Sequence, residues 1–118
     1  MKYNSIEAFV PSGSDFQASR QLFLELGFHI VWETNDYAGF ENNGFRFILQ
    51  RNEAKEFAEN FMLRVTVDDL EEFWQKISEK DLPEKFGVNL KEPTNFPWGR
   101  EVNMIDIAGV CWHFAEKS

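Results

Sequence analysis

Hydrophobic and polar positions along this chain repeat one order of elements twice. Each half opens with an apolar strand-like run, continues through an amphipathic helical stretch and closes with short alternating runs. The helical stretches begin at Ser14 and Asp68, and their offset of about 54 residues also carries the first strand onto the fifth and the fourth onto the eighth. This order predicts one α+β domain over residues 1–118, in which two βαβββ modules form a cupped mixed sheet. Module 1 covers about 3–50, a polar linker with some helical character covers 51–60, and module 2 covers about 61–116.

Both expected helices carry start and stop signals. Ser14 and Asp68 are each followed three positions later by Gln or Glu, which is the spacing of a capping box. Gly27 ends the first helix, because glycine readily adopts the left-handed conformation found after a helix, and Pro83 follows the second. The pattern therefore predicts one helix in each module, capped by Ser14 and by Asp68.

Short apolar or alternating runs predict eight strands, separated by turn residues such as Asn42-Asn43-Gly44. The expected strands are Ile6–Val10, Phe28–Glu33, Tyr37–Glu41, Phe45–Gln50, Phe61–Val67, Val88–Glu92, Arg100–Ile105 and Val110–Ala115. One module alone could not bury both faces of its sheet, so the two modules must pack together.

Composition and charge exclude several classes of protein. The chain has 118 residues, of which 43% are hydrophobic, and this suffices for one domain with a core. A formal charge of −8 argues against nucleic-acid binding, which requires clustered Lys and Arg side chains. No apolar run approaches the roughly 20 residues of a membrane span, and the first residues lack a signal-peptide core. With Cys111 as the single cysteine, we expect a cytoplasmic protein without nucleic-acid or membrane partners.

Four short motifs carry a family resemblance. They are Leu24–Phe28 at the end of the first helix, Val67–Leu70 before the second, Pro97–Glu101 in a loop and Asp106–Gly109 in the last turn. In their order and spacing they resemble the vicinal oxygen chelate superfamily, which includes glyoxalase I, extradiol dioxygenases, fosfomycin-modifying enzymes and bleomycin resistance proteins. The resemblance covers nearly the whole chain and implies a glyoxalase/bleomycin resistance-like fold. It departs at Ile107 and Val110, where the family usually has an acidic or proline residue and an asparagine.

The resemblance also implies where a metal would bind. Metalloenzymes of this superfamily place His on the first and fifth strands and commonly Glu on the fourth and eighth. The corresponding positions here are near Ser5, near Ile48 or Gln50, at Met62 and at His113. Only His113 is a good ligand, and three such ligands are the usual minimum for a catalytic divalent ion. We therefore expect no metal cofactor, unless a slipped alignment brings in Glu7 or Glu101.

Strand alternation selects a different set of residues for the cleft. The side chains expected to face it are Glu7, Phe9, Met62, Arg64, Cys111 and His113. The residues that alternate with them, Leu63, Val65, Val67, Trp112 and Phe114, are expected in the core. Cys111 and His113 lie two apart on one strand, about 7 Å from each other, which is too far for direct proton transfer. A cysteine enzyme is therefore not favoured.

Two tryptophans complete the candidate site. Trp98 lies in a loop between Pro97 and Gly99, and the resemblance to bleomycin resistance proteins implies a ligand or dimer contact for it. Trp32, on the second strand, is a second such aromatic residue. Structural alternatives remain open for several residues. Trp98 could close the end of the sheet, His113 could bond a neighbour, Arg64 could pair with Glu7, and Phe9 could belong to the core.

The expected function is binding without catalysis. We expect the chain to bind or sequester a small amphipathic molecule, cationic or neutral, in a cleft between modules of a homodimer. The molecule would be a bleomycin-type drug or an unknown metabolite. Its acidity would suit a cationic ligand. The alternative is a metal-dependent lyase or dioxygenase of the glyoxalase type, against which the residues at Ser5 and Met62 argue.

Overall fold

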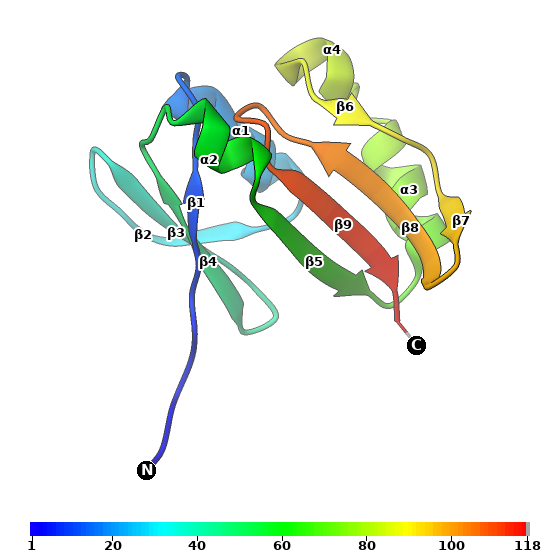
Figure 1. Ribbon diagram of the computed structural model, residues 1–118, viewed down its shortest axis with the longest axis horizontal. Helices are drawn as coiled ribbons and strands as arrows, with labels where there is room; N and C mark the ends of the chain where they lie inside the picture. Colours follow the sequence, from blue (N-terminus) through cyan, green and yellow to red (C-terminus); the bar gives the residue numbers. More distant parts are fainter. Residues whose placement is uncertain (118) are drawn as a thin grey trace.

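The computed structural model describes residues 1–117 and shows two modules side by side (Figure 1). Module 1 contains β1 (Phe9–Pro11), α1 (Phe16–Glu25), β2 (His29–Glu33), β3 (Tyr37–Asn42) and β4 (Phe45–Gln50). A short helix, α2 (Lys55–Glu59), lies in the segment that joins the modules. Module 2 contains β5 (Met62–Val67), α3 (Leu70–Ser78), α4 (Leu82–Phe86), β6 (Asn89–Leu90), β7 (Thr94–Phe96), β8 (Gly99–Ile105) and β9 (Cys111–Glu116).

Each module forms one mixed sheet with the same arrangement of its first and last strands. Sheet 1 has the order β1-β4-β3-β2, and sheet 2 has the order β5-β9-β8-β6 with β7 paired to β8. β1 runs parallel to β4, and β5 runs parallel to β9, while the other pairs are antiparallel. The duplicated α+β architecture expected from the sequence is therefore confirmed, with the strands divided between two sheets.

The two modules differ in length, and this corrects the offset expected for their last strands. The strand that completes module 1 begins at residue 45 and its counterpart in module 2 begins at residue 111, a separation of 66. Helix α4 and strand β7, which the hydrophobic pattern did not predict, lie in module 2 and lengthen it. An offset of about 54 therefore applies to the helices but not to the strands that close the modules.

Both long helices begin one residue later than expected, and for the same reason. The Asp15 carboxylate accepts a hydrogen bond from the backbone N–H of Ala18, and the Asp69 carboxylate accepts one from Glu72. Because a side chain caps the N–H three residues ahead, Asp15 and Asp69 are the caps, one position after Ser14 and Asp68. No helix within residues 1–117 is long and apolar enough to cross a membrane.

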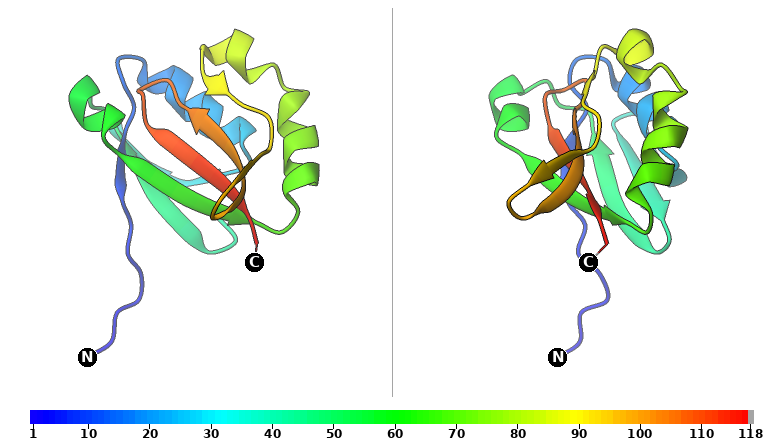
Figure 2. Two further views of the ribbon diagram at one scale, coloured as in Figure 1. Left: turned by 45° about the vertical axis from the view of Figure 1, so that its right-hand side comes forward. Right: turned by 90° about the vertical axis from the view of Figure 1, so that its right-hand side faces the viewer.

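The first strand is shorter than the apolar run predicts. Its three residues pair with β4, beginning with Phe9 opposite Ile48. The carbonyl of Ala8 still accepts a 2.9 Å hydrogen bond from Ile48. Residues 1–7 leave the body of the molecule as an extended arm (Figure 2), and Ile6 is fully exposed on it. Strand-like alternation alone could not show where the pairing partner ends.

The inner faces of both sheets share one core. Trp112 of β9 lies 5.1 Å from Phe23 of α1 and 5.3 Å from Phe47 of β4, measured between ring centroids. On its other side, Phe114 packs against Phe73 of α3 at 4.6 Å. The core positions predicted for Trp112 and Phe114 are thus confirmed. A chain of aromatic rings therefore joins module 1 to module 2.

The turn between β8 and β9 is organised by a buried carboxylate. Oδ1 of Asp106 accepts hydrogen bonds from the backbone N–H groups of Ala108, Gly109 and Val110. Oδ2 accepts a 2.8 Å bond from the indole of Trp112. Burial raises the pKa of Asp106, and these hydrogen bonds oppose the rise. The motif at Asp106–Gly109 therefore serves the fold, since it sets the register of the last two strands.

Candidate functional site

The outer faces of the two sheets, which point away from the shared core, carry most of the candidate site residues. On sheet 1 this face, called the aromatic face below, consists of Phe9, Trp32, Tyr37, Gly39, Ile48 and Gln50. On sheet 2 it consists of Met62, Arg64, Glu101, Asn103, Cys111 and His113, called the polar face below. Strand alternation correctly placed Phe9, Met62, Arg64, Cys111 and His113 on these faces.

The aromatic face is held by close packing. A Cβ atom on Gly39 would lie 2.2 Å from Nε1 of Trp32, so the indole rests directly on the glycine backbone. The rings of Phe9 and Tyr37 meet edge to face at 6.1 Å. Trp32 stays 41% exposed and Phe9 stays 51% exposed, so neither residue belongs to the core. The face therefore presents aromatic rings to solvent in fixed positions.

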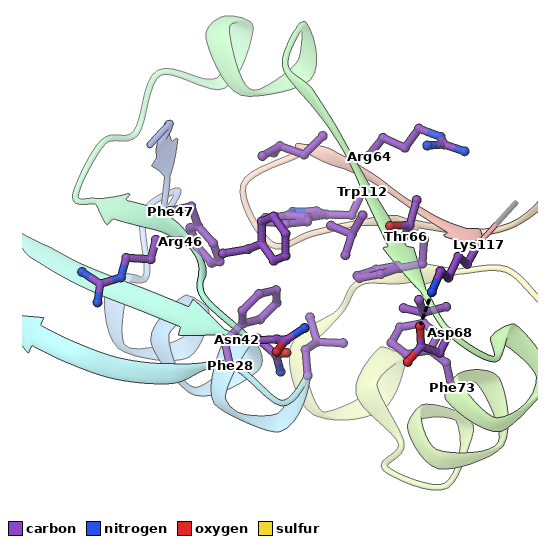
Figure 3. A pocket seen from close by; sticks show the side chains of 17 residues that line it. Phe28, Asn42, Arg46, Phe47, Arg64, Thr66, Asp68, Phe73, Trp112 and Lys117 are labelled. Atoms are coloured by element: carbon purple, nitrogen blue, oxygen red, sulfur yellow. Dashed lines mark ion pairs between the residues drawn. The ribbon is translucent and has the colours of Figure 1, made fainter. Parts of the chain in front are cut away.

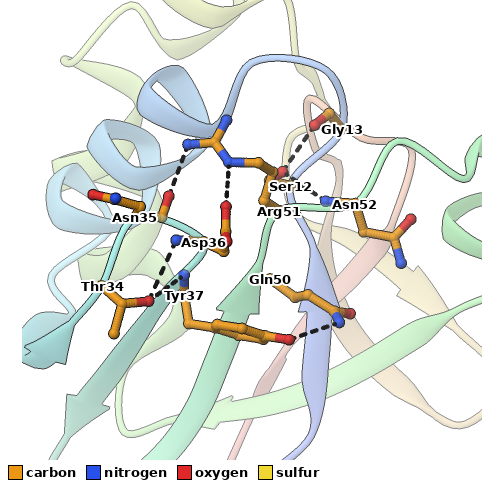
Figure 4. Close-up of polar contacts among 9 residues, drawn as sticks. All are labelled: Ser12, Gly13, Thr34, Asn35, Asp36, Tyr37, Gln50, Arg51 and Asn52. Atoms are coloured by element: carbon orange, nitrogen blue, oxygen red, sulfur yellow. Dashed lines mark hydrogen bonds and ion pairs between the residues drawn. The ribbon is translucent and has the colours of Figure 1, made fainter.

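Hydrogen bonds beside this face fix the turn that leads into β3 (Figure 4). Arg51 donates from Nε to Asp36 at 3.0 Å and from its terminal nitrogen to the carbonyl of Asn35 at 2.8 Å. The hydroxyl of Thr34 accepts from the backbone N–H of Tyr37. The start of β3, and with it the ring of Tyr37, is therefore anchored on both sides of the turn.

The polar face is held by a chain of hydrogen bonds that ends at Trp98. Nδ1 of His113 lies 2.9 Å from Oε1 of Glu101, and Nε1 of Trp98 donates to Oε2 of the same carboxylate at 3.0 Å. Glu101 is only 3% exposed, whereas Trp98 is 66% exposed. The Trp98 ring also stacks on Phe96 across the β7–β8 hairpin at 4.9 Å. Of the alternatives left open for His113, the one in which it bonds a neighbour is observed. Trp98 lies at the edge of this face.

Cys111 lies closer to His113 than strand geometry predicts. Its Sγ is 3.4 Å from Nε2 of His113, because both side chains lean toward each other, and the estimate of about 7 Å was wrong. Burial raises the pKa of the Cys111 thiol, and the negative charges of Glu101 and Asp106 raise it further. The thiol thus keeps its proton at neutral pH, which argues against a nucleophilic cysteine even at this distance.

Two other features of the polar face concern charge and hydrogen bonding. Arg64 makes no salt bridge with residues 1–117, so the alternative in which it pairs with Glu7 is not observed. Glu7 instead accepts a hydrogen bond from Ser5 in the arm. The side-chain oxygen of Asn103, opposite His113 in the sheet, is buried and accepts no hydrogen bond from the described residues. A ligand with an N–H or O–H group would satisfy this acceptor.

A groove of about 780 Å³ lies between module 1 and β5 and shares only Arg64 with the two faces (Figure 3). Its floor is aromatic and includes Phe28, Phe47 and Trp112, and its rim carries Arg46 and Arg64. The β5 residues expected in the core, Leu63, Val65 and Val67, are half-buried and line it. Of the predicted site residues, Arg64 alone lines this groove. Arg46 pairs with Glu41 and Lys117 pairs with Asp68, whereas Arg64 has no salt-bridge partner within residues 1–117.

The metalloenzymes that this chain resembles bind a divalent ion at four strand positions. The donor atoms at the corresponding positions here do not suit such an ion. Met62 and His113 are close, with Sδ and Nε2 3.4 Å apart, but Ser5 lies in the exposed arm. Glu101 is engaged by His113 and Trp98, and no group of three or more His, Cys, Asp or Glu side chains within residues 1–117 is placed to hold a metal. A thioether is a poor ligand for the hard or borderline ions of this chemistry.

Sequence comparison agrees with the duplicated architecture. A family model described as the Glyoxalase/Bleomycin resistance protein/Dioxygenase superfamily matches residues 5–112. The chain belongs to this superfamily. Among curated proteins, none has a sequence that matches at a significant level.

Solved structures of the superfamily share the fold. A bleomycin-binding protein complexed with bleomycin superposes with a TM-score of 0.82 at 18% identity, over 98% of this chain and 100% of its own. TnmS3, an antibiotic-binding protein from Streptomyces sp. CB03234, gives 0.77 at 19% identity, over 100% and 99%. The fosfomycin resistance protein FosX from Listeria monocytogenes, complexed with Mn(II) and sulfate, gives 0.75 at 10% identity, over 100% and 93%. Because one fold can host many functions, function has to be argued from this chain's own side chains.

Sequence reasoning missed several residues that shape the two faces. Glu101 entered only as a metal ligand in a slipped alignment, yet it binds His113 and Trp98. Asn103 follows it by two positions on β8, so strand alternation from Glu101 would have found it. Gly39 gave no signal in the sequence. Glycine is required there only because the Trp32 indole, from the neighbouring strand β2, occupies the space that a Cβ atom would fill.

Proposed function

We propose that the protein binds a small amphipathic molecule without transforming it, between the aromatic face of one copy and the polar face of a second copy. The observation that carries the proposal is that Trp32 and Trp98 are exposed yet held in place by specific contacts. Exposed rings in fixed positions bind ligands at a low entropic cost, because little motion is lost on binding. A tryptophan that only faced solvent would need no such support, whereas Trp32 packs on Gly39 and Trp98 bonds the buried carboxylate of Glu101.

The polar face supports a ligand that carries hydrogen-bond donors. The buried oxygen of Asn103 lacks a donor among the described residues, and its desolvation is favourable only when a donor reaches it. Glu101 adds a negative charge beneath the same face. An organic molecule with a flat apolar part and an amine or amide would therefore match both faces.

A second copy of the chain would close the site. Each outer face is open in the single chain, because the shared core occupies only the inner faces of the sheets. A two-fold dimer would place the aromatic face of each protomer against the polar face of the other and create two equal sites. The exposed side chains of Phe9 and Met62 would then be covered. The cytoplasm is the proposed location of this dimer.

Similar folds give bleomycin-type drugs as the first ligands to test. The bleomycin-binding protein and TnmS3 share this fold and bind antibiotics. The alternative of a metal-dependent lyase or dioxygenase is disfavoured here, because the donors near Met62 and His113 do not suit a hard divalent ion. Binding and sequestration need no such ion.

The test is calorimetric titration of the metal-stripped protein with metal-free bleomycin. We expect W32A and W98A each to weaken binding by about 1 to 3 kcal/mol, the range for an anchoring aromatic residue. The matched control is W74F on α3, since Trp74 is half-buried and lies on neither face. Sedimentation velocity should show a dimer at the same concentration.

Two results would contradict the proposal. An affinity that W32A and W98A leave unchanged, while a groove variant such as F45A weakens it, would move the site to the groove beside β5. A monomer that binds bleomycin with full affinity would reject the closing role of a second copy. Circular dichroism on each variant separates loss of binding from loss of fold.

A further inference from the structure

Two sulfur atoms lie close to one imidazole nitrogen on the polar face. Nε2 of His113 lies 3.4 Å from Sγ of Cys111 and 3.4 Å from Sδ of Met62. Register explains the meeting, because Met62 of β5 pairs directly with Cys111 of β9, and His113 follows two residues later on the same face. The cluster thus contains one thiol, one thioether and one imidazole on two adjacent parallel strands.

Glu101 fixes which imidazole nitrogen faces the two sulfur atoms. An ionised carboxylate can only accept, so the 2.9 Å contact makes Nδ1 of His113 the donor to Oε1. In the neutral ring Nε2 then carries the lone pair, and the sulfur atoms of Cys111 and Met62 each lie 3.4 Å from it. Nε2 of His113 and the two sulfur atoms therefore each offer a lone pair. The only exchangeable proton on these three atoms is that of the thiol. A carboxylate behind the imidazole is also the usual outer partner of a metal-binding histidine.

The distance of the imidazole nitrogen from each sulfur atom suits a metal ion. Bonds of about 2.0 Å to nitrogen and 2.3 Å to sulfur, at trigonal or tetrahedral angles, separate N and S ligands by about 3.5 to 3.7 Å. Both observed N···S distances are within a few tenths of an ångström of that range. A small adjustment of the exposed Met62 side chain would open the cluster to its ion.

We infer that Met62, Cys111 and His113 form a binding site for copper(I). Thiolate and thioether ligands favour copper(I) over hard ions, and imidazole also suits copper, so this ion satisfies all three donors. Zinc would find no third hard or borderline ligand, because Glu101 is engaged by Trp98 and His113. The site differs from the divalent site of the superfamily's enzymes in using Cys111 and a thioether.

Binding exchanges a proton for the ion and involves no oxidation. The thiol of Cys111 loses its proton to water, the sulfur–copper bond forms, and copper remains in the +1 state. Copper(I) must therefore be supplied in reduced form, as it is under reducing conditions. The inference does not rest on the proposed organic ligand, because the three donors belong to one chain and need no second copy.

The test is an anaerobic competition titration of the purified protein with copper(I) and a chromophoric copper(I) chelator. We expect one ion per chain with submicromolar affinity, and X-ray absorption should show two sulfur ligands and one nitrogen ligand. C111S should lower the affinity at least about a hundredfold, and M62L about tenfold. The matched control is M104L, since Met104 is a buried thioether on the inner face of β8 and should leave affinity unchanged.

Glu101 is a positioning residue in this inference, and E101Q tests it. Loss of the charged acceptor should weaken copper binding about tenfold and reduce the imidazole signal in the X-ray absorption spectrum. The circular dichroism spectrum should stay unchanged. Three results would each overturn the inference. They are a copper affinity that is micromolar or weaker, a copper affinity in C111S and M62L that equals that of the parent chain, and zinc binding as tight as copper binding. Bleomycin titration of the copper-free parent chain separates this failure from failure of the proposed function, because the organic ligand is expected to bind without copper.

Discussion

The aromatic face and the polar face come from the same strand order but differ in what holds them. On sheet 1, Trp32 rests on Gly39 and Phe9 meets Tyr37 edge to face, so packing fixes the rings. On sheet 2, buried Glu101 bonds both His113 and Trp98, so hydrogen bonds fix the side chains. The first face is sensitive to volume, and the second is sensitive to charge and proton position.

This difference shows how a duplicated fold acquires two chemistries. The inner faces of both sheets are alike, because each must pack apolar side chains into one shared core. The outer faces carry no such constraint, and their side chains differ: sheet 1 has the aromatic face and sheet 2 has the polar face. One repeated scaffold can therefore supply both halves of an amphipathic site.

The largest effect is expected when the turn beneath the polar face is broken. D106A removes four hydrogen bonds and leaves the buried indole N–H of Trp112 unpaired, so we expect a loss of about 3 kcal/mol in the free energy of unfolding. Urea denaturation measures it. D106N keeps an acceptor for the backbone groups and should cost less. Equal stability of D106A and the parent chain would show that these hydrogen bonds do not stabilise the turn between β8 and β9.

An intermediate effect is expected on the aromatic face. G39A places a methyl group against the Trp32 indole, and we expect a loss of about 1 to 3 kcal/mol in stability together with a shift in tryptophan fluorescence. The double variant G39A/W32A is the control, because alanine should be tolerated once the indole is gone. If G39A costs as much in the W32A background, the contact between Gly39 and Trp32 is not its cause.

The smallest effect concerns the thiol on the polar face. Because burial and the charges of Glu101 and Asp106 raise the pKa of Cys111, iodoacetamide should alkylate it several-fold more slowly than a free thiol at neutral pH. The rate should keep rising with pH beyond the range in which an ordinary thiol levels off. E101Q removes one negative charge and should speed the reaction near neutral pH. An alkylation rate equal to that of a free thiol would show that burial and these charges do not raise the pKa of Cys111.

Much of the fold follows from local pattern, but the element limits depend on partners. Hydrophobic period and capping spacing gave the start of both long helices to within one residue, because these signals lie within a few positions of each other. The end of the second helix was placed too late, since Pro83 lies inside the separate helix α4. The first strand was predicted too long, since its end depends on where β4 stops pairing with it. Helix α4 and strand β7 are short, and short elements carry too few residues for a clear period.

The candidate site was recovered only in part. Alternation placed Met62, Cys111 and His113 on one face, because side chains in a strand point to opposite sides in turn. It gave no measure of how far those side chains lean, and the distance between Cys111 and His113 was therefore misjudged. The roles of Glu101 and Gly39 depend on residues from neighbouring strands.

The sequence by itself determined the duplicated order of elements, the family and which side of each strand faces outward. These properties rest on period, spacing and motif, which are local along the chain. The tertiary structure decided which side chains meet across strands: Trp32 on Gly39, Trp98 and His113 on Glu101, and Met62 beside Cys111. Such contacts depend on strand register and side-chain rotamers, which are set only when the whole sheet is assembled.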